Sequence, residues 1–332
     1  MKTIFPKKLS EGDEIRVIAP SRSMAIISEQ LRNTANKRFA DLGLKLSFGK
    51  NIRKRDVFLS SDIKDRVNDI HDAFSDSGVK AIITVIGGFN SNQLLDYIDW
   101  QIIKNNPKIF CGYSDITILN NAIFQKTGLV TYYGPHYSTF GQELYFDYTL
   151  DYFKKCLMEE NSFVVTPSKN WSDDEWYKNQ KRRTPVKNTG WKVINNGRAK
   201  GVVLGGNLCT FNLLQGTDYF PKIKNSILFL EDDEFAGGYS AVEFDRNLQS
   251  IIHLPQFKEV KGIVIGRFQK ASKINLVTMQ KIIKSKKELS KIPVICDADF
   301  EHTDPKITFP IGGQVEIIAS KSPQIKFINI DL

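Results

Sequence analysis

The sequence predicts an α/β protein of two domains, with a parallel, doubly wound sheet in the N-terminal domain and a smaller C-terminal domain of mixed α/β structure. Three observations lead to this prediction. Short apolar runs alternate with helical patterns over the first 135 residues. A polar segment at residues 166–196 then carries three of the four tryptophans of the chain. Beyond it, apolar runs resume and end in two alternating stretches of antiparallel character.

In the N-terminal part, helices are indicated wherever apolar residues recur at helical spacing. One such stripe covers residues 31–42, and Gly43 fits the position just after the helix end. Another covers 63–74, with Ser60 or Ser61 as the predicted N-cap. The remaining helices are expected at 94–103 and 116–125, and the apolar runs predict strands at 14–19, 44–48, 79–86, 108–112 and 129–133. Ligands of such sheets bind at the carboxyl ends of the strands, so residues that follow strands are the functional candidates.

The chain is expected to divide into an N-terminal domain at 1–165, a connector at 166–196 and a C-terminal domain at 197–332. The connector is long and irregular, which is typical of a functional segment, and it is predicted to cover the substrate. In the C-terminal domain, helices are expected from Asn207 and near 241–252. Strands are expected at 201–204, 227–230, 262–265 and 293–295, and as a pair within 314–332 joined at 320–323.

Composition excludes several classes of function. The formal charge is +9, but Lys and Arg are scattered and the one dense run, 181–183, lies in a polar loop. We therefore expect a solvated basic surface and no nucleic-acid polymer as partner. No long apolar run indicates a membrane helix, and the start of the chain lacks the pattern of a signal peptide, so a cytoplasmic protein is expected. The four cysteines form no CxxC pair and are expected to be small buried residues, with neither a metal site nor a disulfide framework.

The chain has four histidines, and two of them are candidates for a catalytic base. His302 lies in a polar turn just past an apolar strand, which is where an α/β enzyme places catalytic side chains. His136 follows another strand and is the second candidate. His71 and His253 are expected at the surface and at a helix end.

Ser114 is the candidate nucleophile. It lies in a Gly-Tyr-Ser-Asp turn between an apolar strand and a helix, where its Oγ would be exposed near the positive end of the helix. The backbone N–H of Asp115 is a candidate oxyanion donor, and Gly88, in the Gly-Gly turn after the preceding strand, is the other. The match to the G-x-S-x-G elbow is partial, and this motif alone favours a simple N-cap serine.

The acid that would orient the histidine follows a third strand. Glu231 is the first residue past an apolar run and fits best, because such an acid should be held by a rigid element. Glu234 is the second choice. The alternative is a solvated or metal-binding acidic loop, although no further ligands in register are evident.

Taken together, these motifs resemble the LD-carboxypeptidase family of serine peptidases over nearly the whole chain. The residues that carry the resemblance lie in segments 87–92, 107–117, 133–135, 205–208, 230–232 and 302–303. The resemblance implies a Ser-Glu-His triad of Ser114, Glu231 and His302, with an oxyanion hole from the amides of Gly88 and Asp115. It also implies a Rossmann-like N-terminal domain, a homodimer, and neither cofactor nor metal.

Two branches of the family differ in substrate. One removes the terminal D-alanine from murein tetrapeptide, and it usually has an arginine where this chain has Ile86. The other resembles the microcin C immunity hydrolase, which cuts the amide bond between an aminoacyl group and a nucleotide. The GGFNSN motif and the tryptophan-bearing loop favour the second branch, with Asn90 and Trp176 as predicted substrate contacts and Trp176 stacked on the nucleobase. The alternatives are the murein activity and a non-catalytic two-domain protein that only binds a ligand.

Overall fold

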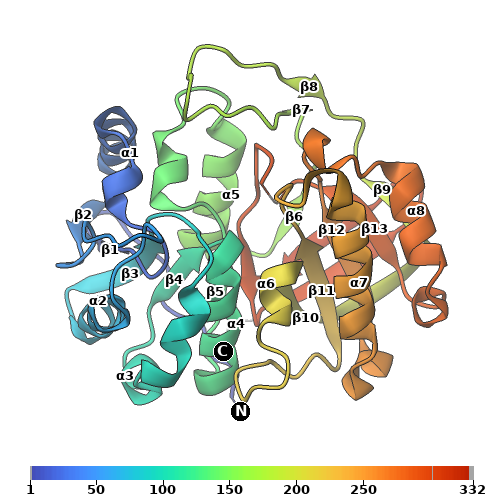
Figure 1. Cartoon of the computed structure of the whole chain (residues 1–332), viewed down its shortest axis with the longest axis horizontal. Helices are drawn as coiled ribbons and strands as arrows, with labels where there is room; N and C mark the ends of the chain where they lie inside the picture. The colour runs from blue at the N-terminus through green and yellow to red at the C-terminus, as the bar shows by residue number, and fades with distance from the viewer. Residues whose placement is uncertain (1, 301, 329–332) are drawn as a thin grey trace.

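The computed structural model describes residues 2–300 and 302–328, and it contains two large sheets that lie side by side (Figure 1). The first sheet has the strand order β14-β5-β4-β3-β1-β2 and is parallel except at β14, which pairs antiparallel with β5. This confirms the predicted parallel sheet in the N-terminal part. Its strands are β1 (Glu14–Ile18), β2 (Lys45–Phe48), β3 (Val79–Thr84), β4 (Ile109–Gly112), β5 (Thr131–Tyr133) and β14 (Phe309–Ile311).

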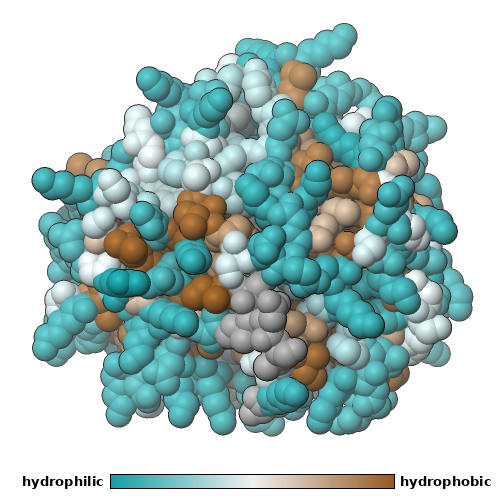
Figure 2. Space-filling model, turned by 180° about the vertical axis from the view of Figure 1, so that it is seen from behind, coloured by the Kyte–Doolittle hydropathy of each residue, from teal (hydrophilic) through white to brown (hydrophobic). Residues whose placement is uncertain are grey.

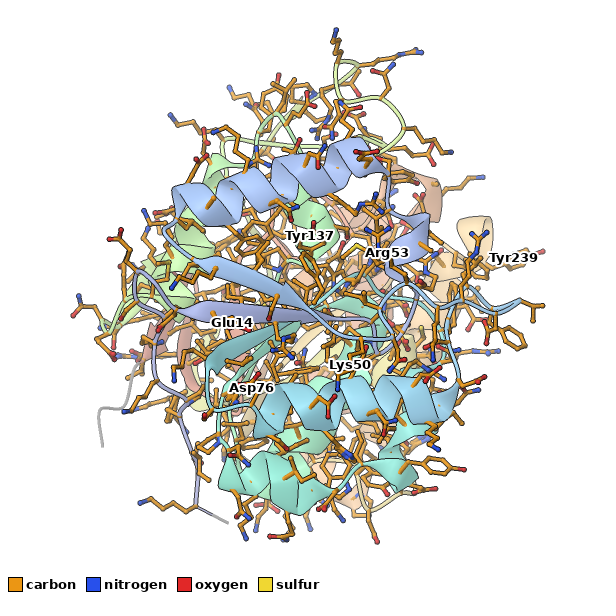
Figure 3. The ribbon with its side chains drawn as sticks, turned by 90° about the vertical axis from the view of Figure 1, so that its left-hand side faces the viewer. Glu14, Lys50, Arg53, Asp76, Tyr137 and Tyr239 are labelled. Carbon is orange, nitrogen blue, oxygen red and sulfur yellow. The ribbon has the colours of Figure 1, made fainter. Side chains whose placement is uncertain are left out.

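Helices cover both faces of this sheet, and Figure 3 shows α1 and α2 on opposite sides of it. Residues of α1 and most buried apolar residues of α5 belong to one core cluster, and residues of α2, α3 and α4 belong to the other. The sheet is therefore doubly wound, as the alternation of strands and helices predicts. The helices are α1 (Glu29–Asp41), α2 (Ile63–Ser75), α3 (Trp100–Asn105), α4 (Thr117–Thr127) and α5 (Asp147–Leu157).

The second sheet is mixed, which confirms the predicted character of the C-terminal part. Its order is β6-β16-β15-β10-β11-β12-β13-β9, with parallel pairing from β10 to β13 and antiparallel pairing on both flanks. The strands are β6 (Phe163–Val165), β9 (Lys192–Asn195), β10 (Gly197–Asn207), β11 (Ser226–Glu231), β12 (Gly262–Gly266), β13 (Val294–Ala298), β15 (Gln314–Ala319) and β16 (Gln324–Ile328). The helices are α6 (Leu208–Asn212), α7 (Ser240–Ile252) and α8 (Leu276–Lys284).

Several local predictions need correction. The expected helix at 94–103 is a 3-10 segment, Ser91–Tyr97, followed by the short α3, because Asp99 caps a new helix through its bond from the N–H of Gln101. The N-cap of α2 is Asp62 and not Ser60 or Ser61. The sequence analysis did not predict helices α5 and α8, although their buried residues recur at helical spacing. Residues 329–332 of the predicted terminal strand pair lie outside the described residues.

The connector contains more structure than expected. It forms the small ladder of β7 (Asn170–Trp171) and β8 (Val186–Lys187) and the edge strand β9. In Figure 1 the segment with β7 and β8 passes over the top of both sheets. The division of the chain at residues 165 and 196 stays a prediction, and the strand β6, just before the first division, pairs in the second sheet.

The chain crosses between the two sheets a second time after β13. It leaves the second sheet there, and β14 joins the first sheet beside β5. His302 lies on this crossing segment. One core cluster contains residues of both sheets, so the two parts share a continuous apolar interior.

The rear face of the molecule is mostly hydrophilic, with apolar patches between the polar side chains (Figure 2). This agrees with the scattered Lys and Arg residues of the sequence. Within the described residues, no helix is both long and apolar enough to cross a membrane.

Candidate active site

Three side chains that are far apart in the sequence meet where the two sheets adjoin. Oγ of Ser114 lies 3.0 Å from Nε2 of His302. The other ring nitrogen of His302, Nδ1, lies 3.1 Å from Oε2 of Glu231. Both distances are those of hydrogen bonds, so the three residues form the linear relay that a nucleophile, a base and an orienting acid require.

Ser114 occupies the tight turn between β4 and α4 that the sequence predicts. Its φ is +60°, in the left-handed region that side chains other than glycine rarely adopt. This conformation costs about 1–2 kcal/mol and lifts the side chain out of the turn, as at the nucleophile elbow of other hydrolases. A Cβ on Gly87 would lie 2.9 Å from Cβ of Ser114, so the Gly-Gly turn can approach the serine only without a side chain.

The carboxylate of Asp115 ties the serine turn to the Gly-Gly loop. It is 2% exposed and accepts hydrogen bonds from Oγ of Ser21 at 2.6 Å and from the backbone N–H groups of Asn90 and Ser91. Burial raises the pKa of this carboxyl, and the hydrogen bonds from these groups oppose that rise. The loop after Gly88 is therefore held against the turn that carries Ser114. The role of the Gly88 and Asp115 amides as oxyanion donors stays a prediction.

Glu231 is the last residue of β11 and is fully buried. The hydroxyl of Tyr133 donates a short hydrogen bond to its Oε1, which leaves Oε2 for His302. Burial lowers the pKa of His302, but the charge and hydrogen bond of Glu231 outweigh burial, so the net pKa is raised. A carboxylate in this position stabilises an imidazolium, which is what a general base becomes after it takes a proton.

Glu234, the second candidate for the acid, has a different place. Its backbone N–H donates to Oε1 of Gln269 at 3.3 Å, and its side chain lines the cavity beside the relay. Burial, together with the charges of Asp173 and Glu175, raises the pKa of Glu234. The geometry therefore puts Glu231, and not Glu234, at hydrogen-bond distance from the histidine.

The other three histidines make packing contacts or hydrogen bonds away from Ser114. His136 is buried below the ring of Tyr113, at 4.2 Å between centroids, and its Nδ1 lies 2.8 Å from Oγ1 of Thr84. Burial and the positive charge of His302 lower its pKa well below the ordinary value. His71 accepts a hydrogen bond from the N–H of Asp99, and His253 is the C-cap of α7. His302 is thus the histidine that the fold brings to Ser114.

A cavity of approximately 460 Å³ opens above the relay. Ser114, His302 and Gly87 line it, and so do Trp176 and its neighbours 173–175 and 177 from the connector. We call residues 173–177 the covering loop. This covering loop is fastened by an ion pair of Asp173 with Lys270 at 2.7 Å and by bonds to Asp174 from Arg183 and Thr184. Residues of the connector therefore line the cavity beside Ser114 and His302, and the covering of a substrate by this segment stays a prediction.

The two predicted substrate contacts differ in position. Trp176 is half-buried, lines the cavity and also packs against the edge of the N-terminal core. Asn90 bonds instead to Ser60, through Nδ2 at 2.7 Å, and accepts from Arg66. It is not among the described residues that line the cavity. Contact of either residue with the substrate stays a prediction.

Sequence reasoning missed three groups of the site. Tyr133 was noted only as part of a motif, although its hydroxyl reaches Glu231. Lys306 and Asp304 form a buried ion pair at the cavity wall, and Arg22 donates to the carbonyl of Gly87 at 3.2 Å. The spacing of Asp304 and Lys306, two residues apart just after His302, was a signal in the sequence that could have predicted this ion pair. Among the described residues, no group of three or more His, Cys, Asp and Glu could hold a metal ion.

Comparison with known proteins now identifies the relationship. Residues 15–134 match the LD-carboxypeptidase N-terminal domain, and residues 200–317 match the LD-carboxypeptidase C-terminal domain. The chain belongs to the LD-carboxypeptidase family. This confirms the resemblance, and the chain is accordingly a serine-type peptidase or hydrolase of that family.

Individual relatives cover almost the whole chain. The putative carboxypeptidase YocD of Bacillus subtilis is 50% identical over 95% of this chain and 96% of its own length. The microcin C7 self-immunity protein MccF of Escherichia coli is 30% identical over 93% of this chain and 91% of its own. Another Bacillus subtilis relative is named a probable murein peptide carboxypeptidase.

Solved structures confirm the fold. An MccF-like protein from Bacillus anthracis is 50% identical and matches with a TM-score of 0.98, covering 99% of this chain and 100% of that one. MccF in complex with glutamyl sulfamoyl guanosine matches with a TM-score of 0.87 at 28% identity, over 98% of this chain and 99% of that one.

Proposed function

We propose that this protein hydrolyses the amide bond of a small peptide or aminoacyl-nucleotide, with Ser114 as nucleophile, His302 as base and Glu231 as the acid that orients the base. The observation that carries the proposal is the unbroken relay from Oγ of Ser114 through both ring nitrogens of His302 to Oε2 of Glu231. The family supplies independent support, because its members are serine peptidases.

In the proposed reaction, Ser114 Oγ attacks the carbonyl carbon of the substrate while Nε2 of His302 takes the hydroxyl proton. Glu231 stabilises the resulting imidazolium. The carbonyl oxygen becomes an oxyanion that accepts hydrogen bonds from the amides of Gly88 and Asp115. The imidazolium then gives its proton to the leaving nitrogen, the C–N bond breaks, and water hydrolyses the acyl-enzyme by the same steps.

A serine-directed phosphonate tests this mechanism and separates it from ligand binding without chemistry. We expect one phosphonyl group per chain, on Ser114, and none on Ser114→Ala protein. A chain that stays unlabelled while it binds a substrate analogue would favour the alternative of a non-catalytic binding protein.

For the substrate we propose an aminoacyl-nucleotide, as in the microcin branch. Ile86 lines the cavity just before the Gly-Gly turn and offers no positive charge to a terminal carboxylate. Trp176 also lines the cavity and offers an aromatic face suited to a nucleobase. Among the structural relatives, MccF has been solved with glutamyl sulfamoyl guanosine and with aspartyl sulfamoyl adenosine, which supports this class of ligand.

Removal of D-alanine from murein tetrapeptide is the second candidate, because the family is named for LD-carboxypeptidase activity. Parallel assays with an aminoacyl sulfamoyl adenosine and with the tetrapeptide decide between them. We expect faster turnover of the nucleotide substrate. A homodimer and a cytoplasmic location also remain proposals, and light scattering of the purified protein tests the first.

A further inference from the structure

The hydroxyl of Tyr133 joins the two ends of the proposed catalytic relay. It accepts a hydrogen bond from the backbone N–H of Ser114 at 3.2 Å and donates a short one to Oε1 of Glu231. Because Glu231 reaches His302 and His302 reaches Oγ of Ser114, these four residues form a closed ring of hydrogen bonds. We call them the hydrogen-bonded ring. It begins and ends on the same serine.

Both sheets hold the phenol of Tyr133 in place. Tyr133 is the last residue of β5 and is 2% exposed, and its ring stacks on Phe309 of β14 with centroids 5.0 Å apart. On the side of the second sheet, a Cβ on Gly206 would lie 2.7 Å from Cε2 of Tyr133. Gly206 is opposite Leu230 in the β10–β11 register, one residue before Glu231. Because Gly206 has no side chain, Tyr133 of the first sheet can reach Glu231 of the second sheet.

We propose that Tyr133 is a positioning residue, which holds Ser114 in its left-handed conformation and stabilises the ionised form of Glu231. The inference rests on the proposed function, because it assigns Tyr133 a part in that reaction. Tyr133 is not among the described residues that line the cavity, so it acts through Ser114 and Glu231 and not on the substrate itself.

The N–H of Ser114 is already engaged by Tyr133 and is not free to bind the developing negative charge. The donors must then come from neighbouring amides, which agrees with the assignment of that role to Gly88 and Asp115. Without the phenol, the N–H of Ser114 would lose its acceptor, and the strained turn would lose one of its anchors.

The pair of Glu231 and His302 carries a net negative charge before it takes a proton and is neutral afterwards. A hydrogen bond to Glu231 stabilises the charged form, so its loss raises the pKa of the pair, whichever atom receives the proton. The acid limb of kcat/KM, which reports this protonation, then moves to higher pH.

Several other ionisable groups face the pair, and they stay in place when only the phenol oxygen is removed. They are Asp232, Asp233, Glu234, Tyr113, His136 and Lys306. If the acid limb shifts in a variant that lacks only the phenol oxygen of Tyr133, the loss of that hydroxyl is the cause.

The test compares Tyr133→Phe with the native protein on an aminoacyl sulfamoyl adenosine. We expect kcat to fall roughly 10- to 100-fold with KM changed less than about 3-fold, because the residue acts on the transition state and not on substrate binding. The acid limb should move up by about 1 pH unit, the size expected for loss of a hydrogen bond to a charged group. Tyr132→Phe is the matched control, since Tyr132 is the buried neighbour on the same strand and packs in the other core cluster.

An acid limb that stays in place in folded Tyr133→Phe protein would overturn the inference. If that variant does not fold, 3-fluorotyrosine placed at position 133 keeps the shape and makes the phenol a stronger donor. The acid limb should then move to lower pH, and an unmoved limb would again overturn the inference. Ser114→Ala in the same assay distinguishes a failure of the proposed function from a failure of the inference about Tyr133. Activity in that variant contradicts the proposed function, whereas an inactive Ser114→Ala with an unmoved limb in the Tyr133 variants contradicts this inference alone.

Discussion

The hydrogen-bonded ring and the covering loop both contribute residues to the same cavity, but they are held in place in opposite ways. Within the ring, Glu231 is fully buried and Tyr133 is 2% exposed, and each member bonds to two others. The covering loop, residues 173–177, lies at the surface, and its Tyr177 is 55% exposed. Its anchors are the bonds of Asp173 and Asp174 to residues near the surface.

The ring and the loop therefore differ in what a substitution can change. A buried network with every member satisfied fixes atoms to within a fraction of an ångström, which acyl transfer requires. The loop lies outside this network. Its ion pair of Asp173 with the exposed Lys270 contributes about 0–1 kcal/mol, although the guanidinium of Arg183 on Asp174 is buried. We therefore expect ring variants to affect every substrate and loop variants to affect only some.

The largest expected effect is in the ring. Ser114→Ala and His302→Ala should each reduce turnover roughly 10³-fold or more on every substrate, because the members of such a triad act as a unit. Steady-state kinetics on the nucleotide, the tetrapeptide and a small ester measure this, with circular dichroism to confirm the fold. Full activity of Ser114→Ala on any of them would remove the serine mechanism for that substrate.

Glu231→Gln should be strongly impaired, by roughly 10²-fold or more, because a neutral amide cannot stabilise the imidazolium of His302. Glu234→Gln is the matched control. It changes a carboxylate three residues along that lines the same cavity without a bond to the histidine, and its effect on a small ester should be mild. A mild Glu231→Gln and an inactive Glu234→Gln would transfer the role of the acid to Glu234.

In the covering loop, Trp176→Ala should affect nucleotide substrates selectively. An indole stacked on a base contributes about 1–3 kcal/mol, so kcat/KM for an aminoacyl-nucleotide should fall roughly 5- to 150-fold. Hydrolysis of a small ester should survive, since the hydrogen-bonded ring is unchanged. Tetrapeptide cleavage should hardly respond, because that substrate has no nucleobase. Loss of tetrapeptide cleavage with intact nucleotide cleavage would favour the murein branch.

The smallest expected effect is on stability. Burial, with the charges of Glu231 and Asp233, raises the pKa of Asp232 to about 7. Because the folded state then holds this proton more tightly than the unfolded state, Asp232 destabilises the fold increasingly as pH rises from about 4 to 7. Asp232→Asn should add about 1–3 kcal/mol to the free energy of unfolding at pH 8 and little at pH 4. Urea unfolding at both pH values measures this, and an equal gain at both would contradict the assignment.

Local patterns predicted much of this protein. The helical stripes and apolar runs located most strands and helices of the first sheet, since their spacing reports burial directly. Errors occurred where a single capping residue or turn sets the boundary of a helix. Asp99, for example, starts a new helix inside a segment that was predicted as one continuous helix. The short antiparallel strands β9 and β14 were missed, because a strand of three or four residues is recognisable mainly by its partner.

Local sequence patterns show which residues follow strands, and they therefore yield the short list that contains Ser114, Glu231 and His302. The meeting of these three side chains depends on the tertiary structure. Their contacts depend on the order of the strands and on the chain crossing between the sheets after β13, and no local pattern encodes either. The link from Tyr133 to Glu231 spans 98 positions and needs the open space at Gly206, so it exists only when both sheets are in place.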